Sequence, residues 1–174
     1  MAQHERQRRF DAQLREHQGI VLKVASLYAR TVEDRRDLAQ EICVQLWRSF
    51  DRYDASRAKF STWLYRIALN VAISHLRRPE QGWEGRLEPL ETSHLETIGG
   101  DAAPEPDERL ADLYAFIGRL DALNRALILL YLEERSYTEI AEILGISETN
   151  VATKIGRIKQ TLRGQMVGAT TAGA

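Results

Sequence analysis

The sequence predicts an all-α fold, and three observations support this prediction. Hydrophobic residues recur at the three- and four-residue spacing of amphipathic helices on both sides of the chain's middle. No segment alternates hydrophobic and polar residues as a half-buried β-strand does. All four prolines lie between positions 79 and 106, so they interrupt neither helical stretch. We therefore expect an N-terminal helical bundle (1–78) and a C-terminal four-helix domain (108–164), joined by a flexible linker (79–107).

Charge is distributed unevenly among these three parts. The chain has 174 residues and a net charge of −1. Residues 1–78 hold fifteen Lys/Arg and nine Asp/Glu, a balance of +6, whereas the linker holds one Arg and eight acids, a balance of −7. Residues 108–174 hold eight of each. The net charge therefore conceals a basic block beside an acidic linker, and each part has to be considered separately.

The composition also indicates where the protein works. A single cysteine excludes an internal disulfide and fits a reducing compartment. No apolar run approaches the roughly 18 residues that a membrane span requires. The first residues, MAQHERQRRFD, lack the apolar core of a signal peptide. We expect a cytoplasmic protein with no membrane partner.

In the N-terminal part, helices are expected over residues 6–30, 34–51 and 60–77. The second of these buries a stripe that contains Leu38 and Ile42. Its opposite face is mostly polar and is either simply solvated or a docking surface for a basic partner. The residues of that face are Asp37, Gln40, Glu41, Val44 and Arg48.

The third helix has a buried stripe and a separate polar face. Trp63 lies at the boundary between them, where it is either part of the core or available to a ligand. Aromatic rings that stack on unpaired bases, with Arg on the phosphates, are typical of proteins that hold single strands. Polar candidates for such contacts are Arg57 and Lys59 before the helix, and Arg66, Asn70 and Arg77 within it.

The C-terminal part is predicted to contain four helices. Residues 107–120 and 121–134 form two amphipathic helices. Ser136 and Glu139 have the spacing of a capping box that begins the third helix. Gly145 suits the left-handed conformation at that helix's end, and Ser147 is a typical N-cap for the fourth helix. Two helices around a tight glycine turn are the layout of a helix-turn-helix.

The last helix is expected to bury Val151, Ile155, Ile158 and Leu162 and to present its other face to DNA. A helix-turn-helix inserts the start of its second helix into the major groove, where small residues allow close approach and Arg contacts guanine. The alternative is a helical hairpin that only packs. The candidate contacts are Thr149, Asn150, Ala152, Thr153, Lys154, Gly156, Arg157 and Lys159.

The residues offer no catalytic or metal-binding constellation. The four histidines, at positions 4, 17, 75 and 94, are scattered, and no glycine-rich phosphate loop is present. No two histidines or cysteines have the spacing of metal ligands, and Cys43 is expected in the core. We expect neither an enzyme nor a cofactor.

Both parts together resemble one family. DLAQEICVQLW, followed by YDASRAKFSTWLYRIALNVAISHLRR, resembles the second conserved region of bacterial extracytoplasmic-function (ECF) sigma factors. SYTEIAEILGISETNVATKIGRIKQTLR is similar to their fourth region, and also to the DNA-binding domain of LuxR-type regulators. The resemblance covers most of residues 10–78 and 110–163. The order and spacing of the two regions favour the sigma factors.

The resemblance implies a mechanism. ECF sigma factors are detachable promoter-recognition subunits of RNA polymerase. Asp37, Gln40 and Glu41 match the residues that dock on the coiled coil of the polymerase's largest subunit. The loop 54–60, which ends at Phe60, and the helix with Trp63 match the part that holds the melted −10 element. The last helix matches the −35 reader, residues 113–132 would contact the flap of the other large subunit, and the acidic linker would thread the polymerase's basic cleft.

Some features depart from the family or leave alternatives open. Ala152, Thr153 and Gly156 stand where family members commonly carry long or basic side chains, so the −35 sequence is not predicted. A one-component helix-turn-helix regulator, or a sigma mimic that sequesters an anti-sigma factor, remains an alternative. Whether an anti-sigma factor binds this chain also stays open. We expect weak promoter binding by the free protein and a disordered tail over residues 165–174.

Overall fold

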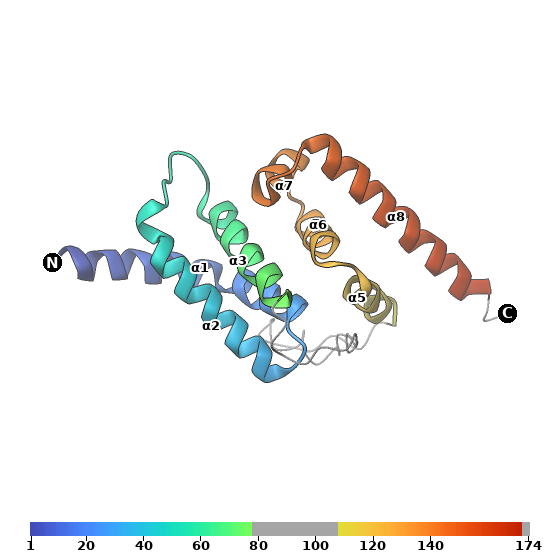
Figure 1. Cartoon of the computed structure of the whole chain (residues 1–174), viewed down its shortest axis with the longest axis horizontal. Helices are drawn as coiled ribbons and strands as arrows, with labels where there is room; N and C mark the ends of the chain where they lie inside the picture. Colours follow the sequence, from blue (N-terminus) through green and yellow to red (C-terminus); the bar gives the residue numbers. More distant parts are fainter. Residues whose placement is uncertain (78–107, 172–174) are drawn as a thin grey trace.

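The structure is a computed structural model that describes residues 1–77 and 108–171, coloured along the chain in Figure 1. Every regular element in these two stretches is helical, which confirms the predicted all-α class. Within them, no helix combines the length and the apolar character that crossing a membrane requires. The acidic linker expected over residues 79–107 lies outside the described residues.

Residues 1–77, here called the N-terminal block, form three helices that all contact one another. Helix α1 spans Ala2–Tyr28, α2 spans Val32–Ser49 and α3 spans Phe60–Leu76, each within a few residues of its predicted range. A short 3-10 turn, η1 (Phe50–Arg52), follows α2. The predicted apolar stripes face inward and form a core that includes Phe10, Val24, Leu38, Ile42, Leu46, Phe60, Leu64 and Leu69.

Residues 108–171, the C-terminal block, form four helices in the predicted order. They are α5 (Glu108–Arg119), α6 (Ala122–Leu132), α7 (Tyr137–Leu144) and α8 (Glu148–Thr171). Asp121 begins α6, because its carboxylate accepts a hydrogen bond of 2.8 Å from the backbone N–H of Asn124. The buried side chains come from all four helices and include Phe116, Ile117, Leu127, Leu130, Ile140, Val151, Ile155 and Ile158.

Helix α8 is longer than the sequence suggests. The sequence predicts a disordered tail from residue 165, yet the helix continues to Thr171. Contacts with α5 give a physical reason for this extension. Arg119 donates a hydrogen bond of 2.9 Å to the side chain of Gln165, and Leu162 and Met166 line a groove together with Phe116. The second half of α8 therefore has a surface to pack on.

The two blocks lie against each other. Helix α3 contacts α6 and α7 in addition to α1 and α2. Figure 1 shows this arrangement, with α3 between the rest of the N-terminal block and the C-terminal helices. The recognition helix expected from the sequence, α8, extends away from this contact on the far side of α6 and α7. The sequence did not predict how the blocks are arranged.

Candidate nucleic-acid interface

The helix-turn-helix has the local geometry that its capping residues predict. The Ser136 hydroxyl accepts a hydrogen bond of 3.1 Å from the N–H of Glu139, which begins α7. Gly145 ends α7 in the left-handed conformation, with φ of 69°. The Ser147 hydroxyl accepts a hydrogen bond of 3.1 Å from the N–H of Asn150, which begins α8. Together these residues fix the start of α8 relative to α7.

Helix α8 separates a buried stripe from an exposed face. Val151 and Ile155 are fully buried, whereas the other side of the helix lies open to solvent. A Cβ added at Gly156 would meet no atom within 4 Å, so the backbone there is bare. The exposed candidate residues on this face are Thr149, Asn150, Ala152, Thr153, Gly156 and Arg157, with Lys154 partly exposed.

Two candidates on α8 already have partners inside the block. The Thr153 hydroxyl donates a hydrogen bond of 2.9 Å to the carbonyl of Thr149. The Lys159 ammonium lies 4.2 Å from the centre of the Tyr131 ring on α6, a cation–π contact. Among the candidate cations of α8, Arg157 is exposed and Lys154 is partly exposed, and with the described residues neither makes a contact of the kind that engages Lys159.

The second candidate surface is built around Trp63, near the start of α3. The indole is half-buried, and its ring centre lies 5.1 Å from that of Tyr53 and 5.3 Å from that of Phe60. Phe60 is only 4% exposed, so the structure places it in the core under Trp63 rather than on the surface. These neighbours hold the Trp63 ring in one position, which favours stacking without a loss of side-chain freedom.

The loop before α3 is held by local hydrogen bonds. The Asp54 carboxylate accepts bonds from the Ser56 N–H at 2.9 Å and from the Ser56 hydroxyl at 2.6 Å. These two bonds lower the pKa of the Asp54 carboxyl. The Tyr53 hydroxyl donates to the carbonyl of Ala58 at 3.3 Å, which closes the loop. Arg57 and Lys59 extend from this ordered loop into solvent.

Three further polar candidates lie along α3. Arg66, Asn70 and Arg77 are all exposed. Asn70 also lines an open groove of about 310 Å³ between α2 and α3, whose opposite wall includes Glu41. The groove therefore joins the α3 surface to the polar face of α2.

The polar face of α2 is exposed as predicted. Asp37, Gln40, Val44 and Arg48 are all at least partly open to solvent, while Leu38 and Ile42 on the opposite side are fully buried. Val44 is a large hydrophobic residue that is 42% exposed. A polar surface with an apolar centre is suited to binding another protein.

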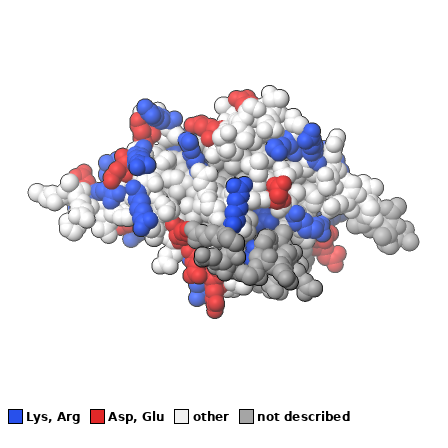
Figure 2. Space-filling model, in the orientation of Figure 1, with Lys and Arg blue, Asp and Glu red and all other residues white. Residues whose placement is uncertain are grey.

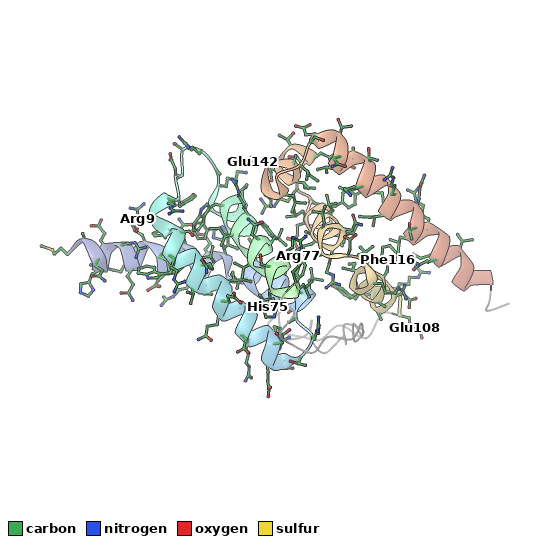
Figure 3. All side chains as sticks on the ribbon, in the orientation of Figure 1. Arg9, His75, Arg77, Glu108, Phe116 and Glu142 are labelled. Carbon is green, nitrogen blue, oxygen red and sulfur yellow. The ribbon has the colours of Figure 1, made fainter. Side chains whose placement is uncertain are left out.

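Glu41 differs from the rest of this face because His75 lies beside it. The His75 ring is 8% exposed, and its Nε2 lies 2.8 Å from the Asp34 carboxylate. Its Nδ1 lies 3.6 Å from the Glu41 carboxylate. Figure 3 labels His75 at the C-terminal part of α3, the helix that packs across α2. Glu41 is therefore directed partly toward α3, and Asp37 is the more accessible acid.

Sequence reasoning missed Tyr53 and His75. Tyr53 precedes the predicted helix, and its only sequence signal is the run of aromatics from Phe50 to Trp63. His75 stands in the last turn of α3, and the sequence presents it only as one of four scattered histidines. Tyr53 contacts Trp63 from a loop, and His75 contacts Asp34 and Glu41, which are distant in sequence. Helical periodicity does not predict contacts of either kind.

The structure shows no metal centre among the residues that it describes. No group of three or more His, Cys, Asp or Glu side chains in residues 1–77 and 108–168 is arranged to hold an ion. Cys43 is partly buried beside the core, and burial raises the pKa of its thiol. A protonated thiol in that position is inert.

Basic side chains do not form one continuous patch. Figure 2 shows Lys and Arg at several separate places on the visible face, with acidic and neutral residues between them. A single cationic surface of the kind that binds any DNA tightly is therefore not evident on that face. Each candidate surface has a few cations of its own.

Comparison with known proteins identifies the two blocks. Residues 14–83 match the family model of sigma-70 region 2, and residues 110–162 match that of sigma-70 region 4. The two matched ranges include the residues of the candidate surfaces described above. The two regions, in this order, define a sigma factor of the sigma-70 type.

Similar proteins show which group of sigma factors this chain belongs to. The chain is 32% identical over 144 residues to the ECF RNA polymerase sigma factor SigW of Bacillus subtilis, covering 78% of this chain and 76% of the relative. It is 31% identical over 154 residues to the ECF RNA polymerase sigma-E factor of Escherichia coli K12, covering 80% and 78%. The chain therefore belongs to the ECF sigma factors, which are transcription initiation factors.

Solved structures agree with this assignment. CnrH, solved in complex with the cytosolic domain of CnrY, has a TM-score of 0.66 and 26% identity, over 93% of this chain and 90% of that one. The sigma factor RpoE of Bartonella quintana, solved in complex with the anti-sigma factor NepR, has a TM-score of 0.67. At 19% identity, over 90% and 96% of the two chains, that second likeness concerns the fold alone.

Proposed function

We propose that this sigma factor binds core RNA polymerase and directs it to promoters by reading the −35 element with α8 and opening the −10 element with α3. The observation that carries this proposal is the presence, in one chain, of two different exposed surfaces whose residue types are suited to nucleic acid. One is a groove-reading helix with small residues and cations. The other is an aromatic ring beside amide and arginine side chains.

Helix α8 has the features that duplex reading requires. Its first turns carry Thr149, Ala152 and Gly156 on the exposed face, and these small residues allow the backbone to approach base edges. Arg157 follows one residue after Gly156 and is exposed, so its guanidinium is free to fork onto a guanine. Lys154 is suited to a phosphate. This surface supports a role at the −35 element.

The α3 surface has the features that hold a single strand. Trp63 offers a ring face held by Tyr53 and Phe60, and stacking does not depend on the identity of the base. Arg57 and Lys59 before the helix supply charge for the phosphates. A surface that binds unpaired bases stabilises the melted strand relative to the duplex. This preference supports a role in opening the −10 element.

The polar face of α2 is the proposed docking surface for the polymerase. Asp37, Gln40 and Glu41 offer acidic and amide groups around the exposed Val44. We assign them to the coiled coil of the largest subunit, in line with the family resemblance. In the C-terminal block, the groove lined by Leu113 and other residues of α5 and α8 is the corresponding candidate for the flap.

An anti-sigma factor is a further proposed partner. CnrH, which is 26% identical to this chain, was solved together with the cytosolic domain of CnrY, and RpoE, which shares the fold, was solved together with the anti-sigma factor NepR. Such a partner would compete with the polymerase for the same exposed surfaces. The fold does not identify such an anti-sigma factor. Capture of binding partners with the full chain would identify it.

Transcription in vitro tests the proposed function. Purified core polymerase, this chain and a genomic promoter library should yield transcripts that start at a defined set of promoters and share −35 and −10 motifs. An Asp37→Arg chain serves as a control that keeps the helix-turn-helix but weakens polymerase capture. If core polymerase starts no specific transcripts with the wild-type chain, the proposed function is wrong. A one-component regulator or a sigma mimic would behave in that way.

A further inference from the structure

His75 lies between two carboxylates that come from one side of α2. It stands in the last turn of α3, where Figure 3 labels it. Asp34 and Glu41 are about two helical turns apart along α2, so their side chains extend from the same side of that helix. The Nε2 of the imidazole lies 2.8 Å from the Asp34 carboxylate, and its Nδ1 lies 3.6 Å from the Glu41 carboxylate. The ring therefore bridges two points of the helix that carries the proposed docking surface.

Asp34 holds the imidazole in one orientation. One oxygen of its carboxylate contacts Nε2 of His75, and the other accepts a hydrogen bond of 3.1 Å from the backbone N–H of Arg30. The N–H of Asp34 donates to the Thr31 hydroxyl at 3.0 Å, in the cap that begins α2. Asp34 is thus fixed by the turn before α2. Because Nε2 is committed to Asp34, the ring directs Nδ1 toward Glu41.

The second ring nitrogen is buried beside Glu41. Nδ1 of His75 is shielded from water and makes no hydrogen bond with any residue that the structure describes. A buried polar atom without a hydrogen bond costs free energy, so a closer approach of the Glu41 carboxylate is favourable. A ring that carries both protons donates to Asp34 and Glu41 at the same time. The geometry therefore draws the Glu41 carboxylate toward His75.

Glu41 also forms part of the wall of the groove between α2 and α3. Among the described residues that line this groove, Glu41 carries the only charge, and Gln45, Asn70 and Ser74 add neutral polar groups. The Glu41 side chain is 27% exposed, so a partner can reach its carboxylate. One carboxylate among neutral polar groups is suited to a single basic side chain of a protein partner.

Fixing Glu41 before the partner arrives favours binding. Glutamate is among the side chains that lose most rotamer freedom when they are ordered, and this loss lowers the affinity of a complex. A carboxylate already held by a buried ring loses less freedom on binding. His75 is anchored on Asp34, so it is a rigid support for this purpose.

We propose that His75 is a positioning residue for polymerase docking, which holds the Glu41 carboxylate at the wall of the groove to bind a basic side chain of core polymerase. His75 acts through Glu41 and does not itself touch the polymerase. This inference rests on the proposed function, because it assigns a residue to the docking step. The contact between His75 and Glu41 does not depend on that function.

NMR on the full free chain tests the contact. The ring proton signals of His75, assigned by their absence in His75→Gln, should shift in Glu41→Gln because the neighbouring carboxylate is removed. Asp37→Asn removes the same charge at an exposed site of α2 and should shift these signals several-fold less. Equal His75 signals in Glu41→Gln and the parent would overturn the positioning role.

Two substitutions separate positioning from a merely structural role. The amide nitrogen of His75→Asn is attached to Cγ as Nδ1 is, so it keeps a donor toward Glu41 and loses Asp34. The longer amide of His75→Gln keeps Asp34 and loses Glu41. Positioning predicts that His75→Gln binds core polymerase about 3–10-fold more weakly, while His75→Asn stays within about twofold of the parent. Denaturant unfolding should give the opposite order, with His75→Asn less stable, because it loses the shorter contact.

Coupling to Glu41 completes the test. In a Glu41→Gln chain, His75→Gln should cause no further loss of polymerase affinity, because no carboxylate is left to position. His4→Gln, at an exposed histidine of α1, should bind as the parent does. If the parent binds core polymerase and affinity follows the order of stability, or the losses at positions 41 and 75 add, the positioning role is wrong and the proposed function stands. If the parent does not bind core polymerase, both fail.

Discussion

Arg157 is the residue on α8 best suited to recognise one base. It is exposed, whereas Lys159 is engaged by the Tyr131 ring. Arg157→Ala should reduce discrimination between the matched −35 element and a mismatched one by about 1–3 kcal/mol, because a bidentate contact with guanine is lost. Competition binding of the polymerase-bound chain against a library of −35 sequences measures this change. The comparison is Arg163→Ala, which should weaken binding to all sequences alike. An unchanged base preference in Arg157→Ala would contradict the assignment.

Gly156 is a second position at which one added methyl group tests the proposed DNA contact. An added Cβ meets no atom within 4 Å, so Gly156→Ala should stabilise the free protein by about 1 kcal/mol through helix propensity. Denaturant unfolding measures that change. If the backbone approaches base edges there, the same methyl group should weaken −35 binding.

Gly164 provides the matched control for this substitution. It lies in the same helix and is equally open around its Cα. Gly164→Ala should give a similar gain in stability and leave promoter affinity unchanged. If Gly156→Ala binds the −35 element as tightly as the parent chain, close approach at Gly156 is wrong.

At the scale of elements, substitution on the exposed face of α2 tests whether this face docks on the polymerase. Asp37→Arg should lower core-polymerase affinity at least tenfold and leave helix content unchanged, because the side chain is exposed and Arg would place a like charge against the basic partner that we propose. Equilibrium binding to labelled core polymerase measures the affinity. Glu16→Arg, an exposed acid on α1, should bind as the parent does. Equal affinity of Asp37→Arg and the parent would discard the docking assignment.

The loop before α3 carries a pH-dependent contact. Hydrogen bonds from Ser56 lower the pKa of the Asp54 carboxyl in the folded loop. A depressed carboxyl pKa contributes stability that is present above the unfolded value, about 3.9, and is lost as pH falls through the folded value. Ser56→Ala should therefore raise the Asp54 midpoint in an NMR titration. Ser74→Ala, at an exposed serine of α3, should not. The same midpoint in both variants would contradict the role of Ser56.

The elements that the sequence predicts best are those fixed by local chemistry. Ser136, Gly145 and Ser147 cap α7 and α8 as expected, because their hydrogen bonds and backbone angles involve neighbours within four residues. The apolar stripe with Leu38 and Ile42 is buried because helical periodicity determines which side faces inward. The end of α8 was less predictable, since its packing on α5 depends on residues such as Arg119, far away in sequence.

At the scale of the whole molecule, the arrangement of the two blocks was not predictable. Arg125 stands among apolar residues of α6, and nothing in the sequence indicates that its guanidinium binds the carbonyl of Leu27, 98 residues earlier in the chain. Backbone carbonyls occur at every residue and leave no pattern of their own. The sequence does not predict the pairing of Lys23 with Glu133 either, because many other pairs of a cation and an acid are possible.

The charge of the whole molecule bears on how the two proposed DNA surfaces would act. The linker's balance of −7 offsets the +6 of the N-terminal part, and the C-terminal part has a balance of zero, so we expect neither proposed surface to bind DNA tightly alone. When both are fixed on one scaffold, the second contact becomes intramolecular and gains from a high effective concentration. Core polymerase is the scaffold that we propose.

The most direct test is therefore a titration of one promoter fragment with the free chain and with the chain bound to core polymerase. We predict weak binding by the free chain, with little preference for the promoter over unrelated DNA, and tight, specific binding by the complex. Specific binding of the free chain below about 1 μM, a free energy of about −8.2 kcal/mol, would contradict this dependence on polymerase.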